Sequence, residues 1–454
     1  MTQHVVIIGG GISGLSAAYD LARADIPHTL FEKMPRTGGV IETRTQDNCV
    51  LECGPDSFLS AKPEMAALIK ELGLEGEIIG SNDSQRTTHI LKHGKLLPLP
   101  EGVMMIVPTK VMPLLKSNLL GWGTKVRMAL ELTRRPRLYP DRSVAEFVVD
   151  HFGQETLDYL AEPLLAGVYG GDPRQLSAAS VLPRFVEMET TEGSLGRAVM
   201  SAKRPASRPS SPPGSSLFKT LASGLGTLTE TLATYAHVKH AAVEAIERRS
   251  GGFRVRTDGE WLDASNVIVA TPAPAAAALV AGIAPELAGL LKTIPYSSSA
   301  IVSLLFDEAK FDGQRAGFGF LVPKRERDRL AACTFVGTKF SHRVPADRIL
   351  LRCFLGGVGD QAILSETDDS IVTIAREELR RILGLTCAPL LTMISRWPQS
   401  MAQYTVGHAA RVKEIKARVA AVPGLSLAGN AYDGIGLSDC VRTGRQAAAD
   451  IPRV

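Results

Sequence analysis

The sequence predicts a mixed α/β fold (α+β overall) in which one nucleotide-binding domain is assembled from separate segments of the chain. Three observations lead to this prediction. The β-branched run Val5–Ile8 opens directly into the glycine-rich stretch Gly9–Gly14, which is the order of a strand, a tight turn and a helix. A second strand-and-glycine pattern stands far away, at residues 425–440. Between them, a mainly helical stretch over residues 98–198 is followed by strand-like runs within residues 301–354.

The first unit has the layout of a dinucleotide-binding βαβ motif of the Rossmann type. A helical pattern follows the glycines, and a second strand then ends in an acid. The residues expected to touch the ligand are Gly9, Gly10, Gly11, Ile12, Ser13, Gly14, Glu32 and Lys33. Gly11 lacks a Cβ and lets a pyrophosphate approach the backbone, while the N–H groups at the helix start attract its charge. Glu32 is placed to accept hydrogen bonds from ribose hydroxyls.

Later segments extend the predicted cofactor site. They contribute Arg36, Gly38 and Gly39, then Gly54, Pro55, Asp56 and Ser57, and finally Gly429, Gly434, Ile435, Gly436 and Asp439. The last group joins a strand to a helical pattern and forms a second helix start with unpaired N–H groups. Two such helix starts predict an elongated dinucleotide, which we take to be non-covalently bound FAD. For Arg36–Gly39 taken alone, an exposed β-turn is an equal alternative.

Several further motifs match one family of flavoproteins. They are Gly54–Leu59, Leu97–Gly102, Glu162–Pro173, Leu176-Ser177, Gly224–Leu228, Arg396-Trp397 and Gln403–His408. On these motifs the chain resembles, nearly from end to end, the flavin-dependent porphyrinogen oxidases, which lie within the amine-oxidase-like flavoprotein superfamily. The Glu162–Pro173 and Trp397–His408 blocks are the most specific. The family usually has Ala where Gly170 stands and Pro where Ala402 stands.

The resemblance implies an activity. A porphyrinogen, with coproporphyrinogen III favoured over protoporphyrinogen IX, is oxidised to the aromatic porphyrin of haem biosynthesis. O₂ is the acceptor and hydrogen peroxide the product. An amine oxidase, a carotenoid desaturase and a non-catalytic carrier of the same fold are the alternatives.

The resemblance also carries over individual residues. It places Lys62 and Gly167 at the active site, Val243 against the adenine and Trp397 near the flavin. Read without it, Lys62 is a solvated lysine at a helix start, Gly167 a helix-breaking turn and Val243 a plain strand residue. His408 and Cys440 are expected to be structural. The cations that could hold the substrate's propionates are not ranked by the sequence: Arg86, Lys92, Lys95, Lys339 and Arg343.

Nucleotide-binding features at both ends of the chain predict discontinuous domains. We expect a Rossmann-type FAD-binding domain from residues 1–61, 217–295 and 422–454. A mixed-sheet substrate domain (62–97 and 296–421) and a helical domain (98–199) are inserted into it. Strands are expected at Ile301–Phe306, Phe318–Val322, Ala332–Val336 and Ile349–Phe354. Residues 200–216, rich in Ser and Pro, are expected to form a mobile linker.

Composition excludes some function classes. A net charge of +4 over 454 residues is too mild to indicate nucleic-acid binding. The longest uncharged stretch, Ala264–Pro285, is interrupted by Pro272 and Pro274 and predicts no membrane span. Six cysteines without metal spacing indicate reduced thiols, no metal site and a cytoplasmic setting. A strand at residue 4 argues against a signal peptide. Peripheral membrane contact through Val103–Leu120 remains an alternative, and no feature fixes an oligomeric state.

Overall fold

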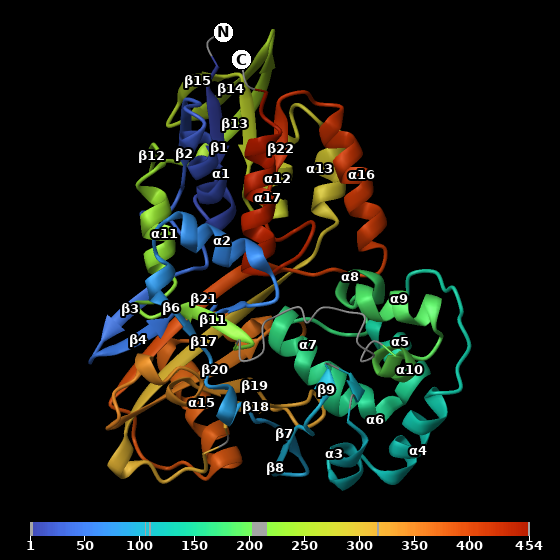
Figure 1. The fold of residues 1–454 in the computed structure, drawn as a ribbon. Helices are drawn as coiled ribbons and strands as arrows, with labels where there is room; N and C mark the ends of the chain where they lie inside the picture. The colour runs from blue at the N-terminus through green and yellow to red at the C-terminus, as the bar shows by residue number, and fades with distance from the viewer. Residues whose placement is uncertain (1–2, 105, 109, 202–215, 316, 453–454) are drawn as a thin grey trace.

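The computed structural model describes residues 3–104, 106–108, 110–201, 216–315 and 317–452. Figure 1 shows a sheet region that carries both ends of the chain, a larger sheet below it, and a helical region beside the larger sheet. The predicted linker, residues 200–216, lies mostly outside the described residues. The three-domain division stays a prediction, while the mixed α/β fold class is confirmed.

The first sheet is wholly parallel and is built from distant segments. Its strands, in spatial order, are β12 (Val238–Lys239), β2 (His28–Phe31), β1 (Val5–Ile8), β16 (Asn266–Val269) and β22 (Leu425–Leu427). The four residues of β1 are buried, as expected for a central parallel strand covered on both faces. Helix α1 (Ile12–Arg23) follows β1, α11 (Gly226–Ala233) precedes β12, and α17 (Leu437–Ala449) follows β22. Helix α2 (Pro63–Glu71) packs on α17.

The second sheet is mixed and has seven strands. In spatial order they are β21 (Leu391–Ala402), β17 (Tyr296–Asp307), β20 (Arg348–Gly356), β19 (Leu330–Phe335), β18 (Gly319–Leu321), β7 (Thr88–Lys92) and β8 (Lys95–Pro98). Only the β18–β7 pair is parallel. The amphipathic helix α15 (Asp368–Leu383) covers one face with Ile371, Ala375 and Leu379. Thr367 begins this helix by accepting from the Ser370 N–H, and Gly384 ends it in the left-handed conformation.

Along the chain, the helical region stands between β8 and β11. Its helices are α3 (Val111–Lys116), α4 (Trp122–Glu131), α5 (Val144–Phe152), α6 (Gln154–Thr156), α7 (Glu162–Tyr169), α8 (Ala178–Val181), α9 (Pro183–Thr191) and α10 (Leu195–Ser201). A capping box between Ser143 and Glu146 begins α5. Gly170 ends α7 in the left-handed conformation (φ 54°), so a glycine suits this position better than the family's usual alanine.

Smaller sheets and further helices complete the fold. The sheets are β13 (Val243–Arg249), β14 (Gly252–Thr257) and β15 (Glu260–Ala264); β5 (Phe58–Leu59), β11 (Phe218–Leu221) and β6 (Ile78–Gly80); β3 (Thr43–Gln46) and β4 (Cys49–Glu52); and β9 (Val103–Met104) and β10 (Val107–Pro108). The helices are α12 (Ala273–Val280), α13 (Pro285–Lys292), α14 (Val336–Lys339) and α16 (His408–Ala420).

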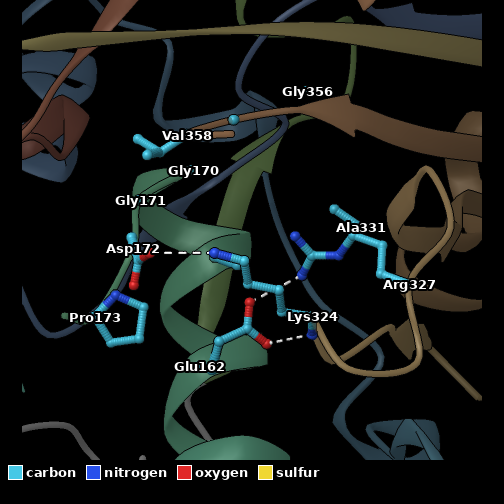
Figure 2. Close-up of a pocket in the computed structure, with 12 residues that line it drawn as sticks. Glu162, Gly170, Gly171, Asp172, Pro173, Lys324, Arg327, Ala331, Gly356 and Val358 are labelled. Carbon is cyan, nitrogen blue, oxygen red and sulfur yellow. Dashed lines mark hydrogen bonds and ion pairs between the residues drawn. The ribbon is translucent and has the colours of Figure 1, made fainter. Parts of the chain in front are cut away.

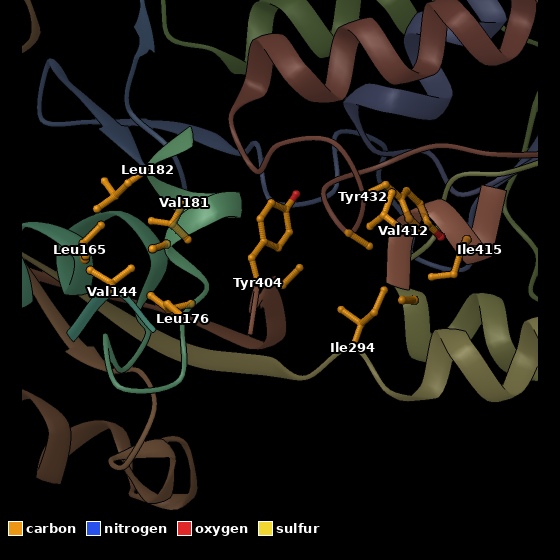
Figure 3. Close-up of a cluster of buried hydrophobic side chains, with 14 of the residues drawn as sticks. Val144, Leu165, Leu176, Val181, Leu182, Ile294, Tyr404, Val412, Ile415 and Tyr432 are labelled. Atoms are coloured by element: carbon orange, nitrogen blue, oxygen red, sulfur yellow. The ribbon is translucent and has the colours of Figure 1, made fainter. Parts of the chain in front are cut away.

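One buried cluster joins the helical region to the parallel sheet. It includes Leu165 and Leu176 on the helical side and Ile415 on α16. Figure 3 shows Tyr404 between these two groups of side chains, with Tyr432 on the same side of Tyr404 as Ile415. The two regions therefore share a continuous core, and the segment after β21 lies where they meet.

Candidate functional site

The glycine turn after β1 is shaped by contacts that only glycine allows. Gly9 has a φ of 109°, and a Cβ on Gly14 would lie 2.0 Å from the carbonyl oxygen of Gly9. In contrast, a Cβ on Gly11 would meet no atom within 4 Å. Gly11 therefore opens onto free space directly before α1, where the buried Ile12 and Ser13 begin the helix. This is the geometry that lets a pyrophosphate approach helix N–H groups.

Glu32 is held against this turn. Its Oε2 accepts from the Gly10 N–H at 2.7 Å, and its Oε1 accepts from the Met34 N–H at 2.8 Å. Each carboxylate oxygen keeps a second lone pair for a ribose hydroxyl. Lys33 is exposed and has no hydrogen bond or ion pair among the described contacts.

The second glycine pair packs on the first. The Gly38 N–H donates to the Gly10 carbonyl at 2.8 Å, and a Cβ on Gly39 would lie 3.2 Å from the Gly11 Cα. Arg36 braces this loop, because its Nη2 donates to the Gly39 carbonyl at 2.7 Å. This segment therefore packs on the opening glycine turn, while its place in the cofactor site and a phosphate contact of Arg36 stay predictions.

Trp397 brings β21 to the same place. Its Nε1 donates to the Cys53 carbonyl at 2.7 Å, and the Arg36 guanidinium lies 5.9 Å from its ring centroid. A Cβ on Gly54 would lie 1.9 Å from the Val40 carbonyl oxygen and 3.7 Å from the Trp397 ring. The segments 36–40, 53–54 and 397 are thus in direct contact.

Asp56 is engaged by two cations, Lys339 at the end of α14 and Arg352 on β20. Its two oxygens each lie 2.9 Å from the Lys339 Nζ, and Oδ2 lies 3.3 Å from Arg352 Nη1. Burial opposes ionisation of the carboxyl, but the Lys339 ammonium and the Arg352 guanidinium outweigh it and hold the pKa of Asp56 well below its usual range. Arg352 Nη2 also donates to the Gly54 carbonyl at 2.5 Å. This cluster fixes the Gly54–Ser57 loop on the mixed sheet.

The sequence analysis missed this cluster. It placed Asp56 in the cofactor site and left Lys339 among the propionate candidates, and it assigned no role to Arg352. Arg352 occupies a central strand, β20, and is 2% exposed. An arginine in an otherwise apolar strand run (Ile349–Leu355) is the signal that indicates a buried ionic partner.

Two other propionate candidates are also engaged internally. Arg343 is 1% exposed and donates from Nη2 to Glu52 Oε1 at 2.7 Å and to Thr220 Oγ1 at 2.6 Å. Lys92 donates to Glu155 Oε1 at 2.8 Å and to the Leu119 carbonyl at 2.7 Å. Both cations already pair with groups inside the protein, so the structure does not support a role for them in holding propionates. Arg86 and Lys95 lie at the surface.

The C-terminal segment returns to the opening glycine turn. A Cβ on Gly444 of α17 would lie 2.1 Å from the Ser13 carbonyl oxygen of α1, and Figure 1 shows the two helices side by side. The Gly429 N–H donates to Thr443 Oγ1 at 3.2 Å, and no atom lies within 4 Å of a Cβ on Gly429. Gly444 lies two turns into α17, and Cys440 in the first turn of α17 also lies beside Ser13. The start of α1 therefore packs along the first half of α17, which is compatible with one elongated ligand at the two helix starts.

Asp439 and Lys62 meet at the start of α17. The Lys62 Nζ lies 2.5 Å from Asp439 Oδ2, which also accepts from the Gly436 N–H at 3.3 Å. Gly434 has a φ of 127°, and a Cβ there would lie 2.3 Å from the Asp439 Cγ. Ile435 is partly buried and packs on the core. The structure thus brings a predicted catalytic lysine and a predicted cofactor residue into one ion pair.

Gly167 and Val243 are placed less decisively. Gly167 lies inside α7, so the reading of it as a helix-breaking turn is wrong. It is exposed, and a Cβ there would meet only Leu321 Cδ2, at 3.5 Å. Val243 begins β13 and packs on the largest core cluster. No contact joins Val243 to the glycine turn, and its role at an adenine stays a prediction.

His408 and Cys440 have structural surroundings. The His408 ring stacks on Tyr404 at a centroid distance of 3.9 Å, and its Nε2 lies 3.2 Å from the Tyr432 carbonyl. Burial lowers the pKa of His408 to about 4, so the ring is neutral at pH 7. Cys440 is buried beside Ser13, and burial raises the pKa of its thiol to about 12. Neither group is prepared for acid–base or nucleophilic chemistry.

Tyr404 is a site residue to which the sequence analysis gave no role. Its hydroxyl donates to the Asn430 carbonyl and accepts from the Gly434 N–H, both at 2.8 Å. It therefore ties the Gln403–His408 motif to the loop before α17. The family block at the end of α7 is tied in as well, because Gln403 Nε2 donates to the Tyr169 carbonyl at 2.7 Å.

A polar pocket lies at the two ends of α7, as Figure 2 shows. Glu162 accepts from Arg327 Nη2 at 3.1 Å and from the Lys324 N–H at 2.9 Å, while the Lys324 ammonium lies 3.2 Å from Asp172 Oδ2. The two cations are matched by the two carboxylates. The pocket therefore anchors the Glu162–Pro173 block to the loop after β18 and has no surplus charge for a ligand.

The residues present fit a dinucleotide cofactor. Two helices longer than eight residues pack side by side, and the glycines before them leave open space at Gly11 and Gly429. Glu32, Trp397 and the Gly38–Gly39 turn surround the same region through the contacts given above.

Comparisons with known proteins agree with this site. The family model described as flavin containing amine oxidoreductase matches residues 12–452. Coproporphyrinogen III oxidase of Bacillus subtilis (strain 168) is 34% identical, covering 99% of this chain and 97% of the relative. Its namesake in Staphylococcus aureus (strain NCTC 8325 / PS 47) is 31% identical over 99% of each chain. A crystal structure from Exiguobacterium sp. 255-15, assigned as a protoporphyrinogen oxidase, matches with a TM-score of 0.86 and 32% identity, covering 99% of this chain and 98% of that one.

Proposed function

Because this chain belongs to the family of flavin-containing amine oxidoreductases, we propose that it oxidises coproporphyrinogen III to coproporphyrin III with FAD as cofactor and O₂ as acceptor. Full-length similarity to curated coproporphyrinogen III oxidases carries the choice of substrate. The packing of the start of α1 along the first half of α17 supports the cofactor. Protoporphyrinogen IX is the second candidate, because a protein assigned to that reaction shares the fold at 32% identity.

The residues that would hold FAD divide its length between them. Gly9–Gly14 and the start of α1 would bind the pyrophosphate, and Glu32 would bind the adenosine ribose. Gly434, Gly436, the start of α17 and Trp397 would hold the flavin end. When bound, the flavin supplies a two-electron acceptor that O₂ can regenerate.

The protein's own contribution is orientation and exclusion of water. The reaction removes six hydrogens from the macrocycle in three rounds, and each round converts one O₂ into one H₂O₂. A large flat substrate needs a broad slot with apolar walls and a few cations for its carboxylates. Lys62, with a side chain 44% exposed, is the candidate cation next to the start of α17.

The test compares two substrates. The purified protein is expected to be yellow, and denaturation is expected to release FAD. Incubation with coproporphyrinogen III in air is expected to produce porphyrin fluorescence and three equivalents of H₂O₂ per porphyrin, faster than incubation with protoporphyrinogen IX. An anaerobic incubation is the control. A colourless protein points to a non-catalytic carrier, and a yellow protein without porphyrin formation from either substrate contradicts the proposal.

The cellular setting is proposed from the chain's surface and thiols. We infer a cytoplasmic protein, supported by six free cysteines, of which five are buried. None of the described helices has the length and apolarity needed to cross a bilayer. The predicted peripheral stretch Val103–Leu120 is partly core, since Ile106, Leu119 and Leu120 are buried.

Peripheral contact with an anionic lipid surface is better supported at α4. Trp122, Val126 and Leu130 lie four residues apart on this helix and are 69%, 57% and 63% exposed. Lys116, Arg127, Arg135 and Arg137 are exposed nearby. The only acid within residues 110–140 is Glu131, which is buried. An apolar helix face flanked by exposed cations is suited to the interface of an anionic membrane.

A further inference from the structure

The Lys62–Asp439 ion pair joins two segments that are 377 residues apart in the chain. Lys62 is the residue before α2, and Pro63 at the first helical position fixes where its side chain leaves the backbone. Asp439 lies in the first turn of α17, where its carboxylate also favours the positive end of the helix. The contact therefore joins Lys62, which was predicted at the active site, to Asp439, which was predicted at the cofactor site.

Asp439 is held more firmly in this ion pair than Lys62 is. The Asp439 side chain is 9% exposed, whereas that of Lys62 is 44% exposed. Gly434 leaves the space that the carboxylate fills, since a Cβ on Gly434 would lie 2.3 Å from the Asp439 Cγ. The other oxygen, Oδ1, lies 3.6 Å from Arg442 Nη2. A fixed, mostly buried carboxylate thus determines where a long and flexible lysine ends.

Lys62 has donors to spare. An ammonium group has three N–H donors, and Asp439 is the only partner of the Lys62 Nζ among the described residues. The Lys62 side chain is 44% exposed, so a ligand can reach the remaining donors. The end of α7 is linked to the pair through Tyr404: the Tyr169 and Tyr404 ring centroids lie 6.2 Å apart, and the Tyr404 hydroxyl accepts from the N–H of Gly434, which packs on Asp439. Gly167 and Val168, in the same helix as Tyr169, are exposed.

We propose that Asp439 is a positioning residue, which fixes the Lys62 ammonium so that its free N–H donors bind a carboxylate of the tetrapyrrole. This inference rests on the proposed function for the identity of the ligand, and it assigns the ion pair to substrate recognition rather than to electron transfer. A charge-assisted bond to a fixed ammonium is lost when the lysine is removed, and weakened when its anchor is removed.

Binding of coproporphyrin III, the tetracarboxylate product, tests the proposal without turnover. The dissociation constant is measured by Soret titration of the FAD-loaded wild-type protein and of Lys62→Met, Lys62→Arg, Asp439→Asn and the double variant Lys62→Met/Asp439→Asn. Lys62→Met is expected to raise it about tenfold, which corresponds to about 1.4 kcal/mol. Asp439→Asn is expected to raise the dissociation constant about threefold or more. The double variant is expected to raise it no further than Lys62→Met does. Lys62→Arg is expected to keep most of the wild-type affinity.

The kinetic readout separates recognition from chemistry. With coproporphyrinogen III, Lys62→Met and Asp439→Asn are expected to raise KM and to leave kcat within about twofold. Asp433→Asn is the matched control, because this acid stands in the same loop but pairs with Lys416 at the surface, at 2.8 Å. It is expected to match the wild type in both measurements. FAD content and melting temperature are recorded for every variant, so that loss of the fold is recognised.

Three results overturn the proposal. They are an unchanged dissociation constant in Lys62→Met, effects of the two single variants that add in the double variant, and an Asp439→Asn protein that loses FAD while its loaded fraction binds coproporphyrin III normally. Failure of the proposed function is distinct from these, since it appears as a wild-type protein that forms no porphyrin even though the titration arm can still be read.

Discussion

Single atoms decide how closely the two cofactor helices approach. Gly444 of α17 and Gly289 of α13 are both glycines inside helices, but a Cβ on Gly444 would lie 2.1 Å from the Ser13 carbonyl oxygen, whereas a Cβ on Gly289 would meet nothing within 4 Å. Substitution by alanine therefore has the same effect on helix propensity at both sites, but it creates a clash only at Gly444.

Gly289→Ala is expected to stabilise the protein by about 0.5–1 kcal/mol, because alanine favours a helix over glycine. Gly444→Ala is expected to destabilise it by about 1–3 kcal/mol, because the added methyl group pushes α17 away from α1. Urea denaturation measures both, and the FAD retained after gel filtration should fall only for Gly444→Ala. Equal shifts in the two variants would contradict the close contact.

At this scale the sequence predicts glycines and acids of the cofactor site well. Gly9, Gly14 and Glu32 lie where their spacing placed them, because the motif is local and its geometry follows from neighbouring residues. Asp56 and Arg343 could not be placed in this way. Asp56 pairs with Lys339 and Arg352, and Arg343 pairs with Glu52. In each pair the two residues are almost 300 positions apart in the chain.

Four helices of the helical region are fixed by one buried ionic cluster. His151 on α5 is flanked by Glu131 of α4 at Nδ1 and Glu189 of α9 at Nε2, each at 2.9 Å. Glu131 also accepts from the Leu195 N–H at 2.7 Å, at the start of α10. Ionised carboxylates only accept hydrogen bonds, so both ring nitrogens of His151 must donate. This arrangement favours the protonated imidazole.

This cluster predicts a pH dependence of stability. Burial opposes protonation of His151, but its hydrogen bonds to Glu131 and Glu189 outweigh burial and raise its pKa, against an opposing effect of Arg134. A raised folded pKa gives a stabilisation that is complete below about pH 6.5, the value of a free histidine, and is lost as the pH rises through the folded value. Burial opposes ionisation of the neighbouring Asp150, but hydrogen bonds from Arg134 and Arg142 outweigh burial and lower the pKa of Asp150, so this carboxyl does not titrate in this range.

The urea concentration at the midpoint of unfolding of the wild type is expected to decrease as the pH is raised from 6.5 to 9. In His151→Gln this part of the pH dependence disappears, and stability at pH 6 drops by about 3–5 kcal/mol, as for a broken buried ion pair. The difference between the two proteins isolates the histidine from other titrating groups. A difference that stays constant over this pH range would show that His151 is neutral when folded.

Elements were predicted best where a residue pattern repeats within the element. The apolar residues of Asp368–Leu385 recur at helical spacing and predict a helix there, and α15 spans Asp368–Leu383. β21 was not expected. It contains Arg396, Trp397 and Pro398 and has no simple alternation, and its strand form comes from pairing with β17.

For the molecule as a whole, the prediction of an FAD-dependent oxidase with an α/β fold is confirmed by membership of a flavin-containing family. The parallel sheet explains why a discontinuous domain could be expected: β1, β16 and β22 are adjacent in space but come from three parts of the chain. How the helical region packs on this frame depends on the core around Tyr404, which no local pattern reveals.

The exposed face of α4 predicts how the whole molecule behaves near lipid. Wild-type protein is expected to float with phosphatidylglycerol vesicles at low salt and to be released at about 0.5 M salt, because surface attraction is screened. The double variant Trp122→Ser/Leu130→Ser is expected to bind at least tenfold more weakly. Leu390→Ser, which removes a leucine 53% exposed elsewhere, is the control. Equal binding to neutral phosphatidylcholine, or none to either lipid, would refute the proposed contact.

The contact between Gly444 and Ser13 also sets an order of events during synthesis. A ribosome adding about 5–20 residues per second completes the opening glycine turn tens of seconds before it reaches α17. Throughout that interval the nascent chain has only one of the two helix starts that grip the dinucleotide. Tight capture of the cofactor is therefore a late, post-translational event, and a chain truncated before Gly429 can keep most of its core and still emerge colourless.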